Sequence, residues 1–150
     1  MFPLERLRTL AEQEQKTREW LLWQADKRVH QAEEALECAV KTRDAVHEQL
    51  LMMAREGPSI TRLSAAAEHW RRLEAARRVH LSTLAKARAE AEARRAEVMQ
   101  KQIEVKMFDA LKARWEAQAR LLTRHREQRF FDEVAVQRHA RTRREGADDG

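Results

Sequence analysis

The sequence has little of what builds a compact globular core. Aromatic residues make up 5% of its 150 residues, tyrosine is absent and only three glycines are present, whereas charged residues make up 37%. This composition is typical of long helices and coiled coils. The same residue types also dominate disordered tails, but the regular apolar spacing described below favours helices over disorder.

Cysteine and long apolar runs are also scarce. The single cysteine, Cys38, excludes an internal disulfide and fits a reducing compartment. Because it lies between Leu36 and Ala39, we expect its thiol to be a small packing group. No apolar run approaches the ~18 residues of a membrane span, and residues 1–11 lack the pattern of a signal peptide. We therefore expect a soluble, cytoplasmic protein.

The spacings of common catalytic and metal sites are missing. A phosphate-binding loop needs several glycines in a short span, and the two glycines besides Gly57 lie near the end of the sequence. His47-Glu48 begins a helical zinc pattern, but Leu51 stands where the second histidine is required. No histidine follows a glutamate by three positions, as a di-iron bundle site requires. We expect no enzymatic activity, no metal and no cofactor.

One strong helix stop, Glu56-Gly57-Pro58-Ser59, divides the chain. Gly57 can adopt the left-handed conformation that ends a helix, Pro58 cannot continue one, and Ser59 can cap the next. The residues on both sides are rich in strong helix formers. The sequence therefore predicts two long helices joined by a tight bend.

The expected fold is all-α, with two long helices forming an antiparallel coiled-coil hairpin in which the second helix is longer. Its parts are a helix at about 3–56, a turn at 57–59, a helix at about 60–142, a single domain over 1–144 and a disordered tail at 145–150. An extended dimer could also bury the apolar stripe, but the mid-chain stop favours the intramolecular pair. Folding at Gly57 would place Met1 near Ala113 or Arg114.

An apolar stripe with steps of three and four residues follows both predicted helices, as in the seam of a coiled coil. In the first helix it is interrupted by Arg43, and its small residues predict a close approach of the partner helix. That stripe consists of Leu4, Leu7, Leu10, Ala11, Leu21, Leu22, Ala25, Val29, Ala32, Leu36, Ala39, Val46, Leu50 and Met53. The second consists of Ile60, Leu63, Ala66, Trp70, Leu73, Arg77, Leu84, Ala87, Ala91, Val98, Val105, Phe108, Leu111, Trp115, Ala119 and Leu122.

Positive charge is concentrated in the second helix. Residues 1–57 hold nine basic and eleven acidic side chains, whereas residues 58–150 hold 21 and 14. The end of that helix should therefore attract an acidic protein surface, nucleic acid or anionic lipid. Trp20 and Trp23 flank the seam and are candidates for a partner surface or for stacking on bases.

Four stretches in the following order carry a family resemblance: Leu4-Glu5-Arg6-Leu7 with Leu10-Ala11-Glu12-Gln13-Glu14; Gln31-Ala32-Glu33-Glu34; Leu73-Glu74 with Ala76 and His80; and Phe131-Asp132-Glu133-Val134-Ala135. Together they resemble the FliJ family, small coiled-coil components of the bacterial flagellar type III export apparatus. The resemblance covers nearly the whole chain. It implies a stalk similar in fold to the central subunit of rotary ATPases, with no hydrolytic activity of its own.

The resemblance also implies partners and sites. The partners are the hexameric flagellar export ATPase, the cytoplasmic domain of the export gate membrane protein and export chaperones, which would hold the chain at the cytoplasmic face of the inner membrane. The gate site maps onto Ala35, Ala39, Thr42, Val46, His69, Leu73, Ala76 and His80, although Thr42 and Val46 replace aromatic residues of the family. For the ATPase ring we expect Leu4, Leu7, Arg124, Arg126, Phe130, Phe131, Asp132 and Glu133.

Three alternatives remain open at the level of sequence. The first is the equivalent stalk of a virulence type III secretion system, which shares the fold and role. The second is a basic coiled coil that binds nucleic acid, whose affinity would fall steeply with salt; on the family resemblance we expect no nucleic-acid partner. The third is a purely structural coiled-coil spacer, which would have no effect on any ATPase.

Overall fold

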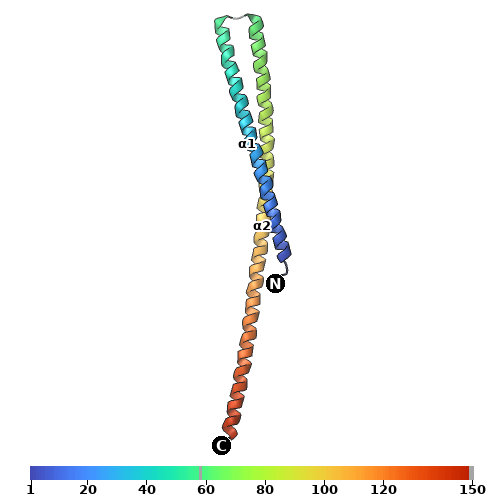
Figure 1. Cartoon of the computed structure of the whole chain (residues 1–150), viewed down its shortest axis with the longest axis vertical. Coiled ribbons are helices and arrows are strands. Elements are labelled where there is room, and N and C mark those ends of the chain that lie inside the picture. The colour runs from blue at the N-terminus through green and yellow to red at the C-terminus, as the bar shows by residue number, and fades with distance from the viewer. Residues whose placement is uncertain (58, 149–150) are drawn as a thin grey trace. The chain divides into compact units, whose positions relative to one another are not determined.

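The structure is a computed structural model that describes residues 1–57 and 59–148. Those residues form two helices, α1 (Glu5–Glu56) and α2 (Ile60–Asp148), with no strand among them. The helices run antiparallel and pack against each other (Figure 1), which confirms the predicted all-α hairpin.

The chain divides into two compact units, each built from parts of both helices. The turn unit comprises Glu12–Ile103, and the terminal unit combines Met1–Ala11 with Glu104–Gly150. Because neither α1 nor α2 can bury its apolar stripe alone, packing between the helices inside each unit supplies the stability.

The bend in the turn unit is built as the sequence predicts. Gly57 has a φ of +69°, the left-handed conformation that glycine adopts without a steric penalty. The Oγ of Ser59 accepts a hydrogen bond from the backbone N–H of Arg62 at 3.3 Å, which caps the start of α2. The predicted contribution of Pro58 lies outside the described residues.

The seam of the turn unit follows a heptad, in which we label the seam positions a and d. Its residues are Leu22, Val29, Leu36, Arg43 and Leu50 at a and Ala25, Ala32, Ala39, Val46 and Met53 at d in α1, with Leu63, Trp70, Arg77, Leu84, Ala91 and Val98 at a and Ala66, Leu73, His80, Ala87, Arg94 and Lys101 at d in α2. Ala25, Ala32, Leu84, Ala91 and Val98 are buried. Ala25, Ala32 and Ala91 are small enough to let the two backbones approach closely, and this close approach stays a prediction.

Ion pairs line both sides of this seam. They join Glu14 to Lys101 at 2.5 Å, Arg18 to Glu97 at 3.2 Å, Arg28 to Glu90 at 3.2 Å, Asp26 to Arg95 at 3.6 Å and Glu33 to Arg88 at 3.4 Å. Arg28 and Glu90 both precede an a residue, at position g, whereas Glu33 and Arg88 both follow a d residue, at position e. The hairpin therefore has a g side and an e side. Each exposed pair contributes at most about 1 kcal/mol, so their main effect is to specify the register.

The terminal unit is held by the first residues of the chain. Phe2 is 7% exposed and packs on Trp115, with ring centroids 6.1 Å apart, while Glu5 pairs with Lys112 at 3.3 Å. The predicted register, with Met1 near Ala113 or Arg114, is therefore displaced by two to three residues, because the bend and the seam pairs set the alignment.

The apolar stripe at the start of α1 differs from the prediction. Leu7 and Leu10 are 49% and 50% exposed, whereas Ala11 is buried. The reason is the heptad: Ala11 and Leu4 occupy d positions, but Leu7 and Leu10 lie at g and c, beside the seam. Phe2 and Ala11, rather than the run of leucines, make the apolar contact.

Two further expectations differ from the structure. Cys38 is exposed, because it lies at position c, on the outside of α1, and is therefore not a packing residue. Residues 143–148 continue α2 beyond the predicted end at about 142. The last two residues of the predicted disordered tail, 149 and 150, lie outside the described residues, and disorder there stays a prediction.

Candidate interaction surfaces

The eight residues assigned to the gate site lie in the turn unit, four on each helix. Ala35, Thr42, His69 and Ala76 occupy g positions, and Ala39, Val46, Leu73 and His80 occupy d positions. Because the g positions of the two helices face each other, all eight lie on the g side of the hairpin. The sequence resemblance thus selects one continuous side of the helix pair.

The burial of these residues divides them into two groups. Thr42 and His69 are exposed, and the other six are half-buried, four of them at d positions in the seam and Ala35 and Ala76 beside it. The hydroxyl of Thr42 donates to the carbonyl of Cys38 at 2.9 Å, so its hydrogen bond is used within α1. Whether this side binds a partner stays a prediction, but its half-buried residues leave part of their surface accessible.

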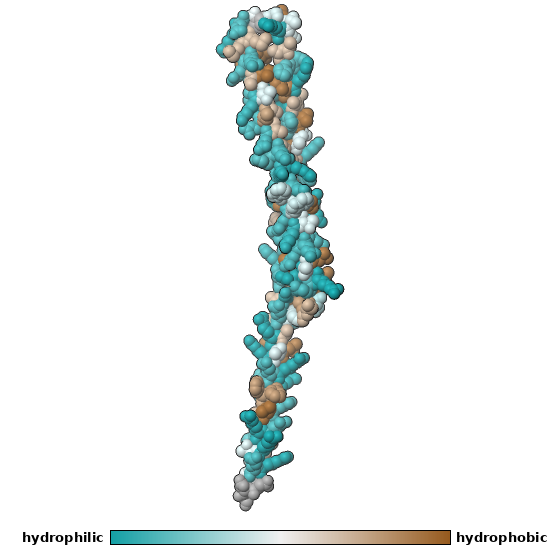
Figure 2. All heavy atoms as spheres, in the orientation of Figure 1, coloured by the Kyte–Doolittle hydropathy of each residue, from teal (hydrophilic) through white to brown (hydrophobic). Residues whose placement is uncertain are grey.

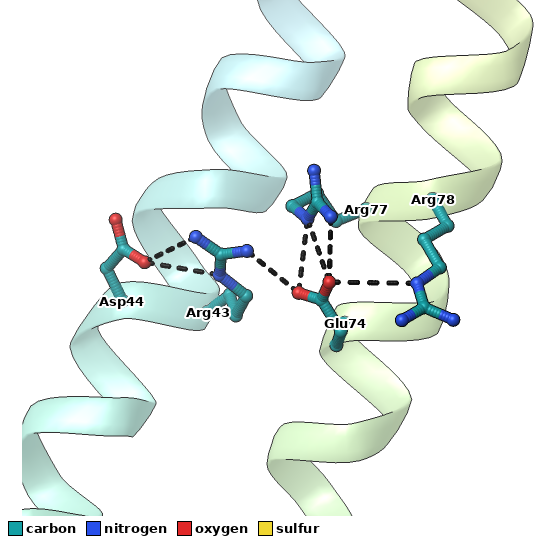
Figure 3. A network of polar contacts seen from close by, with 5 residues as sticks. All are labelled: Arg43, Asp44, Glu74, Arg77 and Arg78. Carbon is teal, nitrogen blue, oxygen red and sulfur yellow. Dashed lines mark hydrogen bonds and ion pairs between the residues drawn. The ribbon is translucent and has the colours of Figure 1, made fainter.

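A charged cluster interrupts the seam next to this region (Figure 3). A guanidinium nitrogen of Arg43 donates to Glu74 at 2.8 Å, and Arg77 donates to the same carboxylate at 2.7 Å. Arg43 also donates to Asp44 at 2.9 Å, and Arg78 lies 3.8 Å from Glu74. The carboxylate therefore joins both helices through arginines on either side.

The surroundings of Glu74 lower the pKa of its carboxyl group. Its side chain is only 16% exposed. Hydrogen bonds from Arg77 and then from Arg43 stabilise the ionised carboxylate more than burial disfavours it, and they lower its pKa from 4.5 to about 2. The same bonds raise the pKa of both arginines, so the cluster stays fully charged at neutral pH. The sequence identified Arg43 and Arg77 as seam residues but did not identify Glu74 as their partner.

Packing is looser in the part of the turn unit that holds the charged cluster and the bend. None of the described residues between Ala32 and Leu84 is buried. Trp70, predicted in the seam, is half-buried, and the centre of its ring lies 6.0 Å from the centre of the His47 ring. Its indole N–H is buried without a hydrogen-bond partner. An unsatisfied buried donor disfavours the folded state locally.

The residues assigned to the ATPase ring all belong to the terminal unit, but they form two groups. Leu4 and Leu7 lie on the segment that packs beside Trp115, and both are partly exposed. Phe130 and Phe131 lie about 22 Å further along α2 at ~1.5 Å per residue. The structure therefore does not bring the leucines and the phenylalanines into one cluster.

The second group lies on a fully accessible stretch of helix. Residues 120–147 are exposed apart from the half-buried Val134, and they include the predicted Arg124, Arg126, Asp132 and Glu133. Phe130 and Phe131 are 62% and 67% exposed and contact each other edge to face at 5.9 Å. Figure 2 shows hydrophobic side chains among hydrophilic ones on this part of the chain. This combination of exposed rings and arginines is typical of a binding surface.

Residues 1–57 and 59–148 contain neither a metal-binding cluster nor a membrane-spanning helix. No group of three or more histidine, cysteine or acidic side chains could hold a metal ion there. Neither helix carries, in the part that the structure describes, a stretch that is long and apolar enough to cross a bilayer.

Comparison with known proteins gives one clear match. The family model described as Flagellar FliJ protein matches residues 1–144 of the chain. The sequence matches no curated protein and no solved structure.

Proposed function

This chain belongs to the flagellar FliJ family, and from that membership we propose that it is a non-enzymatic stalk of the flagellar type III protein export apparatus. In this role it binds the hexameric export ATPase and the export gate, escorts export chaperones, and sits at the cytoplasmic face of the inner membrane through these partners. The observation that carries the proposal is the family match, which extends over residues 1–144 of the 150.

The exposed end of α2 supports the assignment of ATPase binding to the terminal unit. Residues 112–144 hold ten basic and four acidic side chains, which would steer this end toward an acidic surface. Phe130 and Phe131 would then bury their rings against the partner and anchor it. Steering by charge and anchoring by apolar rings are separable, because salt weakens the first much more than the second.

The g side of the turn unit supports a gate site separate from the ring site. The proposed gate residues lie between Ala35 and His80, and none lies in the terminal unit. A variant on the g side should therefore lose one partner without losing the other. Leu73, Ala76 and His80 are the positions at which this chain matches the family pattern on α2.

The first test is ATP hydrolysis by the purified export ATPase, with and without this protein, at moderate salt. We expect a higher rate and more hexamer in its presence, and loss of both effects when residues 120–150 are deleted. Circular dichroism of the deleted chain provides the control for folding. An unchanged rate with a helical, monodisperse preparation would contradict the stalk role and leave the spacer and nucleic-acid interpretations.

The gate site has its own test. Leu73→Ala and His80→Ala should weaken binding to the purified cytoplasmic domain of the gate and leave ATPase stimulation largely intact. Leu81→Ala is the matched control, because Leu81 lies on the opposite, e side and is 47% exposed. Equal loss in all three variants, or loss of helicity, would contradict a separate g-side site.

The flagellar and virulence interpretations differ in the phenotype of a deletion strain. Deletion of the gene should abolish swimming and flagellar filaments, and complementation by the full chain should restore both. A motile deletion strain that fails to secrete virulence proteins would instead identify the injectisome version.

A further inference from the structure

One row of side chains on α1 takes no part in the helix pair. Trp20 and Trp23, in the turn unit, are 56% and 58% exposed, and Lys16 and Lys27 are exposed beside them. We call these four residues the tryptophan row. Their spacing of four, three and four residues places them within about 60° of one another on the helix, over a length of roughly 16 Å. The row lies opposite Leu22 and Ala25, and so directly away from the seam.

The basic and aromatic side chains of the row form one surface. The Nζ of Lys27 lies 5.3 Å from the centre of the Trp23 ring, a distance typical of a cation–π contact. Neither tryptophan is needed to bury the seam, since both point outward. Two neighbouring tryptophans that stay mostly in water contribute little hydrophobic stabilisation to the fold, and tryptophan is one of the residues enriched at binding hot spots.

The side chains on the two sides of the tryptophan row restrict what can cover it. On one side lie the uncharged Thr17 and Gln24, and on the other lie Glu19 and Asp26. Asp26 is paired with Arg95 at 3.6 Å, whereas Glu19 is exposed and accepts a hydrogen bond from the neutral Gln15 at 3.0 Å. A broad anionic surface, such as a bilayer or a nucleic-acid backbone, would meet Glu19 as well as the lysines. A single helix that lies along the row and over the uncharged Thr17 and Gln24 avoids the carboxylate of Glu19.

We propose that the tryptophan row is the docking site for one amphipathic helix of a partner protein that carries acidic residues beside its apolar face. The partner's apolar side chains, spaced three and four apart, pack on Trp20 and Trp23. Its carboxylates pair with Lys16 and Lys27 at the two ends of the row. This site is separate from the proposed ring and gate surfaces, so the proposal does not depend on either of them.

The experiment uses the full chain in the cells that produce it. Trp20 or Trp23 is replaced by the photo-crosslinking residue benzoylphenylalanine, which keeps an aromatic side chain, and the adduct is mapped by mass spectrometry after irradiation. We expect both positions to cross-link to the same helical segment of another protein, with acidic residues beside its apolar positions. The matched control is the same replacement at Met99, which is 57% exposed on α2 and should not yield this adduct.

Other outcomes would overturn the proposal. These are cross-links to lipid or nucleic acid, to a second copy of this chain, to a segment without acidic residues, or to no molecule at all. The row would then be a lipid-facing, nucleic-acid-facing or self-association surface, or simply a solvated face.

Affinity provides the second measurement. A synthetic peptide that copies the cross-linked segment is titrated into the full-length protein. The double variant Trp20→Ala/Trp23→Ala should bind it at least about tenfold more weakly, and Lys16→Glu/Lys27→Glu should show a similar loss that diminishes at high salt. Unchanged affinity in either variant would refute the assigned contacts. Both variants should retain helicity and full stimulation of the export ATPase, which separates failure of this site from failure of the stalk role.

Discussion

Arg43 of α1 and Glu74 of α2 are joined across the seam at 2.8 Å, at a heptad position that carries leucine in the heptads before and after, at Leu36 and Leu50. A seam of alanines such as Ala25, Ala32 and Ala39 specifies register weakly, because similar side chains recur in every heptad. A slip of one heptad would move Arg43 away from Glu74 by about 10 Å and leave a charge in the seam without its partner. The charged cluster therefore specifies which residues of the two helices face each other.

Replacement of the central carboxylate should destabilise the hairpin more than loss of a peripheral arginine. Glu74→Gln removes the anion that Arg43 and Arg77 share and leaves Arg43 with its bond to Asp44, so we expect a lower melting temperature by circular dichroism. Arg78→Ala is the control. Arg78 is 76% exposed, and its contact with the Glu74 carboxylate is long, at 3.8 Å. A larger loss for Arg78→Ala would contradict the role assigned to Glu74.

The same carboxylate should make stability depend on pH in acid. Because its pKa is lowered from 4.5 to about 2, the contribution of Glu74 is complete above about pH 4.5 and is lost as the pH falls toward 2. The difference in melting temperature between the wild type and Glu74→Gln should be constant above pH 5 and should shrink toward pH 2. A difference that persists at pH 2 would show that the two proteins differ in packing rather than in this charge.

Leu84 should be a major apolar contributor to the turn unit. It is 4% exposed at an a position, and Leu84→Ala should lower the free energy of unfolding by ~2–4 kcal/mol, through lost burial and the cavity left behind. Leu81→Ala, three residues away and 47% exposed, should lower it by less than about 1 kcal/mol. Urea unfolding followed by circular dichroism measures both, and equal effects would contradict the heptad assignment.

Phe2 should stabilise the terminal unit locally. Phe2→Ala removes the contact with Trp115, so amides of residues 5–11 and 108–115 should exchange with deuterium faster, while amides around Ala91 keep their protection. Leu7→Ala is the matched control, because Leu7 is 49% exposed and should change exchange little. Faster exchange throughout the turn unit would show that Phe2 acts on the whole chain.

Phe130 and Phe131 should matter for partner binding and little for folding. Because both rings are mostly exposed, Phe130→Ala/Phe131→Ala should leave helicity and melting temperature nearly unchanged. Under the proposed stalk role, stimulation of the export ATPase should fall at least about fivefold, since the anchoring rings are lost. Leu121→Ala, at a residue that is 52% exposed on the same stretch, tests whether the loss is specific to the rings.

The family resemblance and the helical fold could be inferred before the structure because both depend on local features. The stop at Gly57, the cap at Ser59 and the spacing of three and four along Leu22 to Met53 are properties of neighbouring residues, and they predict where helices form and which face is apolar. The same spacing indicated that Trp20 and Trp23 flank the seam, whereas the structure places both on the outer face of α1, away from it. The binding roles of the eight gate residues and of the ring residues stay predictions.

The sequence by itself determined that this chain forms two long helices with a bend at Gly57, because backbone preference and apolar periodicity act over a few residues. Only the tertiary structure decided that Phe2 packs on Trp115 and that Glu74 is the partner of Arg43. Each of these depends on which residues of α1 and α2 face one another. Alanine-rich heptads are too similar to one another to specify that alignment from the sequence. The charged pairs across the seam specify it in the folded protein.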